Sequence, residues 1–381
     1  MALPRSRRAL RRAVELSLVL PAGAAVAFVW ANTAHDSYER FAGALHFAVN
    51  EVGMALFFAL ATKEVVEAAA PGGALHTWRR AALPVVAAAG GMIGPAFLYI
   101  AVVLMQGRPE LARGWAIPCA TDIAFSYLVA KAIFRDHPAI PFLLLLAIAD
   151  DALGLLVLAV FYPTGEGRFG VALGLMTAAL AALLVIRTRR VTSFWPYVLA
   201  GGSLSWLALF FGGLHPALAL VPVVPFMPHA ARDPGLFVDA PPEAHDTLSA
   251  FEHFWKFPVQ IVLLLFGLVN AGVQLDQAGP GTVAVLVAIL AGKPLGILAA
   301  VALALLAGLH LAKGLVWRDL VVVGFAASIG FTVALFFATA AFPPGPLLAQ
   351  AKMGALLSIG GSIGAFVAAA VLGVGRYRQT G

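Results

Sequence analysis

Two adjacent aspartates stand near the middle of a long apolar segment, where charge is expensive. Asp150 and Asp151 interrupt residues 139–162, which are otherwise almost wholly apolar. Each charge at the centre of a membrane helix costs roughly 2.5–3.5 kcal/mol, so the pair costs about 5–7 kcal/mol, whereas a leucine returns only about 0.3–0.6 kcal/mol. We therefore expect the pair to be kept for function rather than for packing. The alternative is that the span is misplaced and that the pair caps a neighbouring helix or faces a loop.

The chemistry open to such a pair is the exchange of a proton for a cation. Burial and a neighbouring carboxylate both favour the protonated form of a carboxyl group, and hard cations prefer carboxylate and carbonyl oxygens. A carboxyl group balanced in this way can bind a proton or an ion such as Na⁺ or Li⁺ in turn. Because neighbours on a helix point about 100° apart, one aspartate can bind the ion while the other pairs with a cation elsewhere.

Lys293 is the candidate for that cation. It stands near the middle of the apolar segment 281–308, within the glycine- and proline-containing stretch 292–296. A lysine at this depth is expected to have a carboxylate partner. Two interpretations remain open, a second proton carrier and a fixed structural salt bridge.

Two further apolar segments are interrupted by polar and helix-breaking residues. Thr121 and Asp122 follow Pro118 in the segment 115–134, and Ser328, Gly330 and Thr332 interrupt the segment 319–341. Broken helices in corresponding positions are a sign of a transporter binding site. Asp122 is expected to compensate the positive ends of half-helices beside the cation site, or simply to cap the following half-helix. Both roles are compatible.

Weaker candidates lie towards the ends of other segments. Glu51 and Glu64 stand at opposite ends of the segment 44–66 and could line ion-access funnels, or could be solvated helix ends. His215 could respond to pH, or could be a capped or core histidine. The sequence contains no Walker motif and no His/Cys cluster typical of a transition-metal site. We therefore expect no cofactor beyond the transported ions.

The elements that position these residues are predicted to be membrane-spanning helices. Of the 381 residues, 61% are hydrophobic and only 12% are charged, against about 25% charged in a soluble domain. A spanning helix needs roughly 17–25 mostly apolar residues. On that basis we expect a single transmembrane domain over residues 1–381 with about twelve spans, near 14–31, 44–66, 81–105, 115–134, 139–162, 168–186, 193–211, 213–228, 254–273, 281–308, 319–341 and 349–373.

The distribution of basic residues predicts the orientation of these spans. If the N-terminus is cytoplasmic, eighteen of the 25 Lys and Arg residues fall on the cytoplasmic side, four outside, and three within or at the ends of spans. This bias favours cytoplasmic termini and a bacterial inner-membrane protein. It also explains the net charge of +6 without nucleic acid as a partner. Residues 229–250 are expected to form the longest cytoplasmic connection.

The same residues allow functions other than coupled exchange. An uncoupled cation channel or a cation or pH sensor would also use interrupted spans. An intramembrane aspartyl protease fits poorly, because it needs carboxylates on separate helices that face one another, whereas Asp150 and Asp151 are adjacent. We therefore do not expect an enzyme.

At these residues the sequence resembles the NhaA-type sodium/proton antiporters. The matching stretches are 114–125, 147–151, 270–273, 292–296 and 329–332, in the order in which the family has them. The resemblance implies twelve helices, with the fourth and eleventh spans unwound and crossed at mid-membrane, and two three-helix repeats related by inversion. It implies that Asp150 and Asp151 are the transport carboxylates, with Asp151 the more direct Na⁺ ligand and Lys293 the partner of Asp150. It further implies electrogenic exchange by alternating access, with more protons moving than sodium ions.

Two regions depart from the family pattern. In the stretch 62–68 only Glu64 and Val65 clearly align with the family's charged sequence. The connection at about 32–43 is too short for the β-hairpin that builds the dimer in some members, so a homodimer would have to form by another route. Lipid and monovalent cations are the remaining expected partners.

Overall fold

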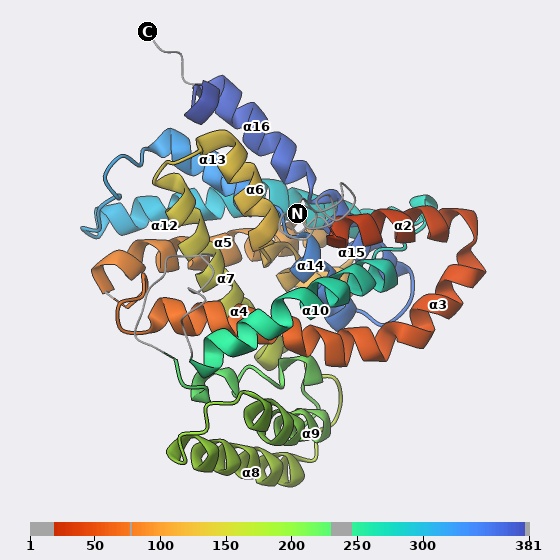
Figure 1. Cartoon of the computed structure of the whole chain (residues 1–381). Helices are drawn as coiled ribbons and strands as arrows, with labels where there is room; N and C mark the ends of the chain where they lie inside the picture. The colour runs from red at the N-terminus through yellow and green to blue at the C-terminus, as the bar shows by residue number, and fades with distance from the viewer. Residues whose placement is uncertain (1–18, 77, 230–245, 378–381) are drawn as a thin grey trace, which may run out of the picture.

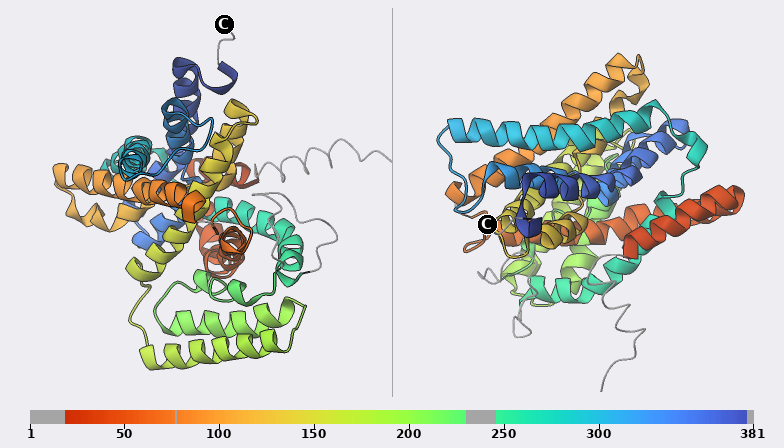
Figure 2. Two further views of the ribbon diagram at one scale, coloured as in Figure 1. Left: turned by 90° about the vertical axis from the view of Figure 1, so that its left-hand side faces the viewer. Right: turned by 90° about the horizontal axis from the view of Figure 1, so that it is seen from above.

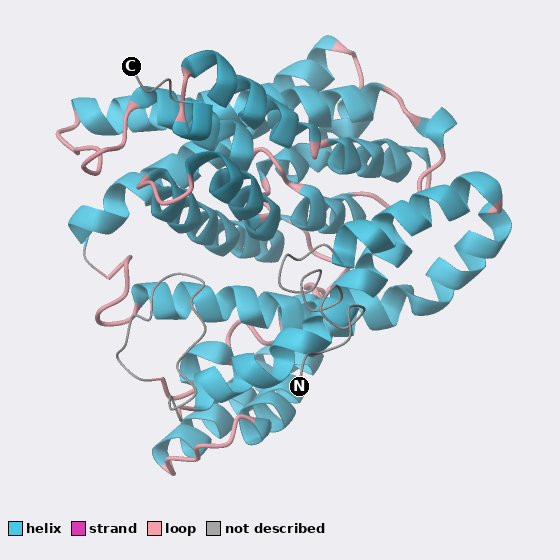
Figure 3. Ribbon diagram, turned by 45° about the horizontal axis from the view of Figure 1, so that its top comes forward, coloured by secondary structure: helices cyan, strands magenta, loops and turns pink. Residues whose placement is uncertain are grey.

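The computed structural model describes residues 19–76, 78–229 and 246–377, and this part of the chain consists of helices joined by loops and turns, without strands (Figures 1 and 3). An α-helix satisfies its backbone polar groups internally, as the apolar interior of a bilayer demands. The α-helices are α2 (Val19–Thr33), α3 (His35–Phe47), α4 (Met54–Ala69), α5 (Trp78–Met105), α6 (Ile123–Phe134), α7 (Ala139–Phe161), α8 (Phe169–Thr188), α9 (Ser203–Phe211), α10 (Thr247–Asn270), α11 (Pro280–Val287), α12 (Lys293–Leu306), α13 (Trp317–Ala327), α14 (Phe331–Ala341), α15 (Pro346–Leu357) and α16 (Gly360–Leu372).

The number of spans is consistent with a multi-pass membrane protein. Seven helical runs among the described residues are long and apolar enough to cross a membrane, or up to nine if each of two bent helix pairs is one span. The described residues also contain two shorter apolar helical segments, Val19–Thr33 and Tyr197–Phe211. The predicted all-helical polytopic class is confirmed, while the count of twelve and the inverted repeats stay predictions.

The second span begins earlier than the sequence predicted. Helices α3 and α4, joined by the π-helical turn η1 (Ala48–Gly53), form one continuous run from His35 to Ala69. The predicted connection at 32–43 was therefore wrong, because only Ala34 separates α2 from α3. Hydropathy did not reveal this helix because its first turns contain polar residues. One pair of them, His35 and Glu39, lies one turn apart, with Nε2 of His35 3.2 Å from Oε1 of Glu39. Glu51 accordingly lies inside the run and not at its end.

Residues 213–228 are not the predicted eighth helix. They fold into turns with two short 3-10 segments, η4 (Pro216–Leu218) and η5 (Val224–Phe226). The prediction was wrong because it weighed the apolar composition alone. Pro216, Pro222 and Pro225 each lack the backbone N–H that an α-helix needs. This segment, with α8 and α9, forms the green lobe at the bottom of Figure 1.

The predicted long connection at 229–250 is shorter than expected at its far end. Helix α10 already begins at Thr247, where the Asp246 side chain accepts a hydrogen bond from the Ser249 N–H at 2.8 Å and caps the helix. The rest of the connection, residues 230–245, lies outside the described residues, as do residues 14–18 of the predicted first span.

Helices α5 and α12 pack closely against each other near the centre of the molecule, and α12 lies directly above α5 in Figure 1 and in the left view of Figure 2. Glycines allow this approach: a Cβ on Gly94 would lie 2.6 Å from the Cα of Gly296. Small residues at such positions let membrane helices approach closely. Helix α12 follows α11 through the π-helical turn η7 (Ala288–Gly292), and Lys293 is its first residue.

Candidate ion-binding site

Two broken spans meet at the centre of the protein. The 3-10 helix η2 (Pro109–Cys119) and α6 bend by 53° about residues 120–122, and α13 and α14 bend by 50° about residues 328–330. The Asp122 N–H donates to the Ile329 carbonyl at 2.6 Å, and the Thr121 hydroxyl donates to the Ala327 carbonyl at 3.1 Å. The two breaks therefore satisfy each other's backbone groups, and both interruptions predicted from the sequence are confirmed.

The Asp122 carboxylate caps two helices at once. One oxygen accepts from the Phe125 N–H at 3.2 Å, in the first turn of α6. The other accepts from the Thr332 N–H at 3.3 Å, in the first turn of α14, and also from the Thr332 hydroxyl. A single carboxyl group thus faces the N-terminal ends of two half-helices, where the helix dipoles favour a negative charge. Asp122 is 6% exposed, so these contacts replace water around it.

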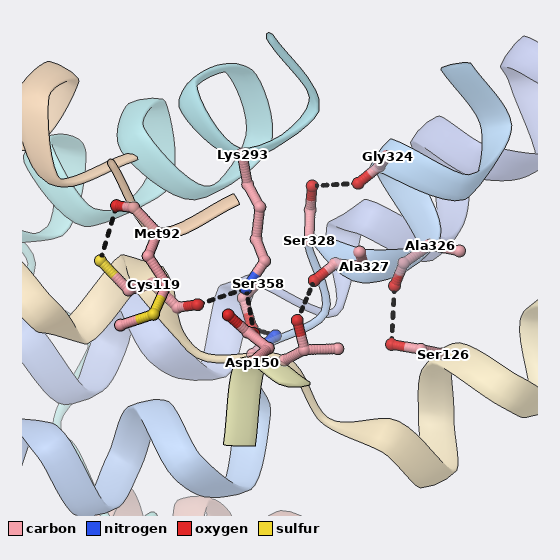
Figure 4. A network of polar contacts seen from close by, with 12 residues as sticks. Met92, Cys119, Ser126, Asp150, Lys293, Gly324, Ala326, Ala327, Ser328 and Ser358 are labelled. Carbon is pink, nitrogen blue, oxygen red and sulfur yellow. Dashed lines mark hydrogen bonds and ion pairs between the residues drawn. The ribbon is translucent and has the colours of Figure 1, made fainter. Parts of the chain in front are cut away.

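Lys293 joins the broken fourth span to the aspartate pair. Its Nζ lies 2.8 Å from Oδ2 of Asp150 and also donates to the Cys119 carbonyl, the last of η2 (Figure 4). Lys293 is fully buried and Asp150 is 4% exposed. A buried charge needs such a partner, since removing one member of a buried pair leaves the other uncompensated. Among the described residues, the second oxygen of Asp150, Oδ1, has no hydrogen-bond partner.

Asp150 and Asp151 share a small, largely apolar cavity. It has a volume of about 20 Å³, and roughly 10–15 Å³ is enough for one water molecule. Besides the two aspartates it is lined mainly by apolar side chains, among them Phe57, Phe58, Met92, Leu155, Phe336 and Phe337. A cation that loses most of its hydration water on entering this space would find the carboxylates as its main polar ligands.

Glu51 and His215 face each other away from this cavity. Oε1 of Glu51 lies 3.7 Å from Nδ1 of His215, and Oε2 of Glu51 is buried with no hydrogen-bond partner in the part of the chain that the structure describes. The His215 ring also contacts Phe336, with the two ring centroids 5.5 Å apart. Since Phe336 lines the cavity, one aromatic side chain separates this pair from the aspartates.

Glu64 belongs to a charge cluster that sequence reasoning missed. Nζ of Lys63 lies 3.3 Å from a carboxylate oxygen of Glu64, 2.6 Å from one of Glu67 and 2.8 Å from one of Glu252. The Lys63 side chain is buried, so it holds together carboxylates from α4 and α10. The acidic residues one and four positions after Lys63 were a signal in the sequence, but Glu252 is distant in the chain. Glu64 is thus a member of an ion-pair cluster and not an isolated helix end.

Two broken, crossed spans beside a buried ion pair define a class of protein, the secondary transporters with discontinuous helices. Among solved structures, the chain resembles the sodium proton antiporter MjNhaP1 from Methanocaldococcus jannaschii, with a TM-score of 0.55 and 14% sequence identity over 94% of this chain and 92% of that one. At this identity the likeness shows the fold.

Comparison of the sequence with those of known proteins assigns the chain to a family. The model of the family described as Na+/H+ antiporter 1 matches residues 7–372, and the chain belongs to that family. It is 43% identical to the Na(+)/H(+) antiporter NhaA of Desulfitobacterium hafniense over 376 residues, covering 96% of both chains. It is 43% identical to that of Geobacter sulfurreducens, covering 95% of this chain and 97% of the relative, and 45% identical to that of a Jannaschia species, covering 90% and 93%. The resemblance drawn from the motifs is thereby confirmed.

Proposed function

We propose that the protein is an electrogenic antiporter that exports cytoplasmic Na⁺, or Li⁺, in exchange for protons by alternating access. One observation carries the proposal: Asp150 and Asp151 line one cavity inside the membrane-spanning region, beside the crossed breaks, and Asp150 is paired with Lys293. The names of the relatives and the family point the same way.

Competition for the aspartates couples the two ions. Asp151 takes up a proton or Na⁺, and neither can occupy the carboxylate while the other is bound, because burial makes an uncompensated charge costly. Sodium entering from the cytoplasm therefore displaces a proton, and a proton entering from outside displaces sodium. No further energy source is needed, since the proton gradient drives the exchange.

The pairing of Asp150 with Lys293 supplies the second proton. When Na⁺ draws the free Oδ1 of Asp150 into its coordination, Lys293 loses part of its counter-charge and releases its own proton. Two protons then move per sodium ion, and the exchange carries net charge. If the salt bridge instead stays fixed through the cycle, a single proton moves and the exchange is electroneutral. The stoichiometry therefore separates the two roles considered for Lys293.

The same proposal includes the placement of the protein in the bacterial inner membrane, with both termini cytoplasmic. The excess of Lys and Arg in segments assigned to the cytoplasm supports it. With this orientation Glu64 and its Lys63 cluster stand towards the cytoplasm, and Glu51 and His215 stand towards the outside. These two groups would then flank the aspartate cavity on opposite sides.

Reconstitution into proteoliposomes tests the proposal. A pH-sensitive dye reports proton movement when Na⁺ is added, with and without a membrane potential. We expect wild type and the Asp276→Asn control to give the same sodium-dependent signal, because Asp276 is exposed and outside the long spans. We expect Asp151→Asn to give none. A sodium flux without any proton movement would instead indicate a channel, and an Asp151→Asn protein that exchanges at the wild-type rate would contradict the site.

A further inference from the structure

The residue that ends helix α7 contacts the broken fourth span. Tyr162 follows Phe161 directly and is the C-cap residue of α7, the helix that carries Asp150 and Asp151. Its hydroxyl donates to the Arg113 carbonyl at 2.8 Å and accepts from the Ala116 N–H at 3.3 Å. Tyr162 is 1% exposed. A buried hydroxyl is costly unless it is paired, and here both partners are backbone groups of η2.

The segment that Tyr162 contacts is an unusual one. The 3-10 helix η2 runs for 11 residues, whereas 3-10 runs beyond three or four residues are uncommon because their hydrogen bonds have poorer geometry. Hydrogen bonds from outside the helix support it at several places, two of them through buried tyrosine hydroxyls. The Tyr99 hydroxyl donates to the Leu111 carbonyl at 2.8 Å, and Tyr162 bonds to it one turn further on. The position of such a helix therefore depends on the side chains that hydrogen-bond to it.

The Tyr162 hydrogen bonds lie close to the end of η2 that reaches the site, where the Cys119 thiol also donates to the Met92 carbonyl at 3.2 Å. Ala116 and Cys119 are three residues apart, which is one turn of a 3-10 helix, about 6 Å along its axis. The Cys119 carbonyl accepts a hydrogen bond from Lys293 Nζ, and Lys293 in turn pairs with Asp150. A continuous series of contacts therefore leads from the Tyr162 hydroxyl to the ion site, although Tyr162 does not line the cavity.

We propose that Tyr162 is a positioning residue for cation binding: its hydroxyl fixes η2 so that the Cys119 carbonyl shares Lys293 with Asp150. This inference rests on the proposed function. With the carbonyl in place, Lys293 divides its hydrogen bonds between two acceptors and Asp150 keeps an oxygen for Na⁺. If η2 shifts, Lys293 turns more fully to Asp150, which then competes less well for the ion.

The expected effect is a weaker affinity for sodium with an intact protein. The Tyr162→Phe variant keeps the ring, which packs edge-on against Phe337 with centroids 5.7 Å apart, and loses only the hydroxyl. A hydrogen bond contributes a net effect of roughly two- to tenfold in an equilibrium constant. We therefore expect the KM for Na⁺, and the Kd measured on purified protein, to rise about two- to tenfold, while the maximal rate stays within about twofold.

The matched control is Tyr197→Phe. Tyr197 is also fully buried, and its hydroxyl also donates to a backbone carbonyl, that of Val191 at 3.3 Å. It lies in the π-helical turn η3 (Tyr197–Gly202) next to α9, remote from η2. We expect its KM and Kd for Na⁺ to equal those of wild type.

The decisive experiment measures sodium binding to purified wild type, Tyr162→Phe and Tyr197→Phe, together with transport in proteoliposomes. A Kd and a KM raised in Tyr162→Phe alone would support the inference. An unchanged Kd would overturn it, as would a lower maximal rate and thermal stability with unchanged KM, which would show a purely structural role. If wild type binds Na⁺ but moves no protons, the proposed function fails while the comparison of Kd values still decides the role of Tyr162.

Discussion

The contact between α5 and α12 predicts that two Gly→Ala substitutions in long helices will have opposite effects on stability. At Gly296, one turn after Lys293, an added Cβ would touch the Gly90 carbonyl oxygen and lie 2.8 Å from the Gly94 Cα. Both are backbone atoms, which cannot rotate away. At Gly174, within α8, an added Cβ would meet nothing within 4 Å.

The size of each effect follows from two terms. Overpacking a tight contact costs about 1–3 kcal/mol. The cost at Gly296 lies at the upper end of this range, because the added Cβ would meet backbone atoms of two residues. Alanine is favoured over glycine inside a helix by about 1 kcal/mol, and this gain applies at both positions. We therefore expect Gly296→Ala to lose about 2 kcal/mol of stability and Gly174→Ala to gain up to about 1 kcal/mol.

Thermal unfolding in one detergent, followed by the loss of the monodisperse chromatographic peak, measures the difference. The unfolding midpoint should fall below that of wild type for Gly296→Ala and rise above it for Gly174→Ala. Equal midpoints for all three proteins would refute the argument that backbone contact fixes the spacing of α5 and α12.

Substitutions at three other contacts give further expected outcomes. Lys293→Met leaves the Asp150 carboxylate buried and unpaired and should cost about 3–5 kcal/mol, whereas Lys293→Met combined with Asp150→Asn should recover most of the melting temperature. Thr332→Val removes a hydrogen bond to the Asp122 carboxylate and should cost about 1.5–3 kcal/mol, while Thr332→Ser should melt like wild type. Lys63→Met leaves three glutamates facing one another without a positive charge between them. The melting temperature of this variant should therefore fall further below that of wild type at pH 8 than at pH 5, because protonation at pH 5 relieves the repulsion between the carboxylates. An equal fall at both pH values would argue against that cluster.

The parts of the site that could be predicted from sequence are those where charge or a helix breaker stands inside an apolar run. Asp150, Asp151 and Lys293 were singled out because the desolvation cost of a charge can be seen without a structure. Pro118 and Gly330 marked the broken spans for a similar reason, since both residues interrupt helices.

The parts that could not be predicted depend on backbone groups or on distant contacts. The Cys119 carbonyl that receives Lys293 has no signature in the side-chain sequence. The pairing of Lys63 with Glu252 joins residues 189 positions apart, on α4 and α10. Apolar composition also misled at residues 213–228, because hydropathy does not register that prolines remove helix hydrogen bonds.

The central claim is that one carboxylate site holds either protons or Na⁺, and calorimetry tests it most directly. Na⁺ is titrated into purified protein near neutral pH in buffers of different ionisation enthalpy, so that the heat reports the number of protons released per sodium ion bound. We predict release of more than one proton per Na⁺ by wild type, and no sodium-dependent release by Asp151→Asn. Sodium binding to wild type without proton release would contradict the account.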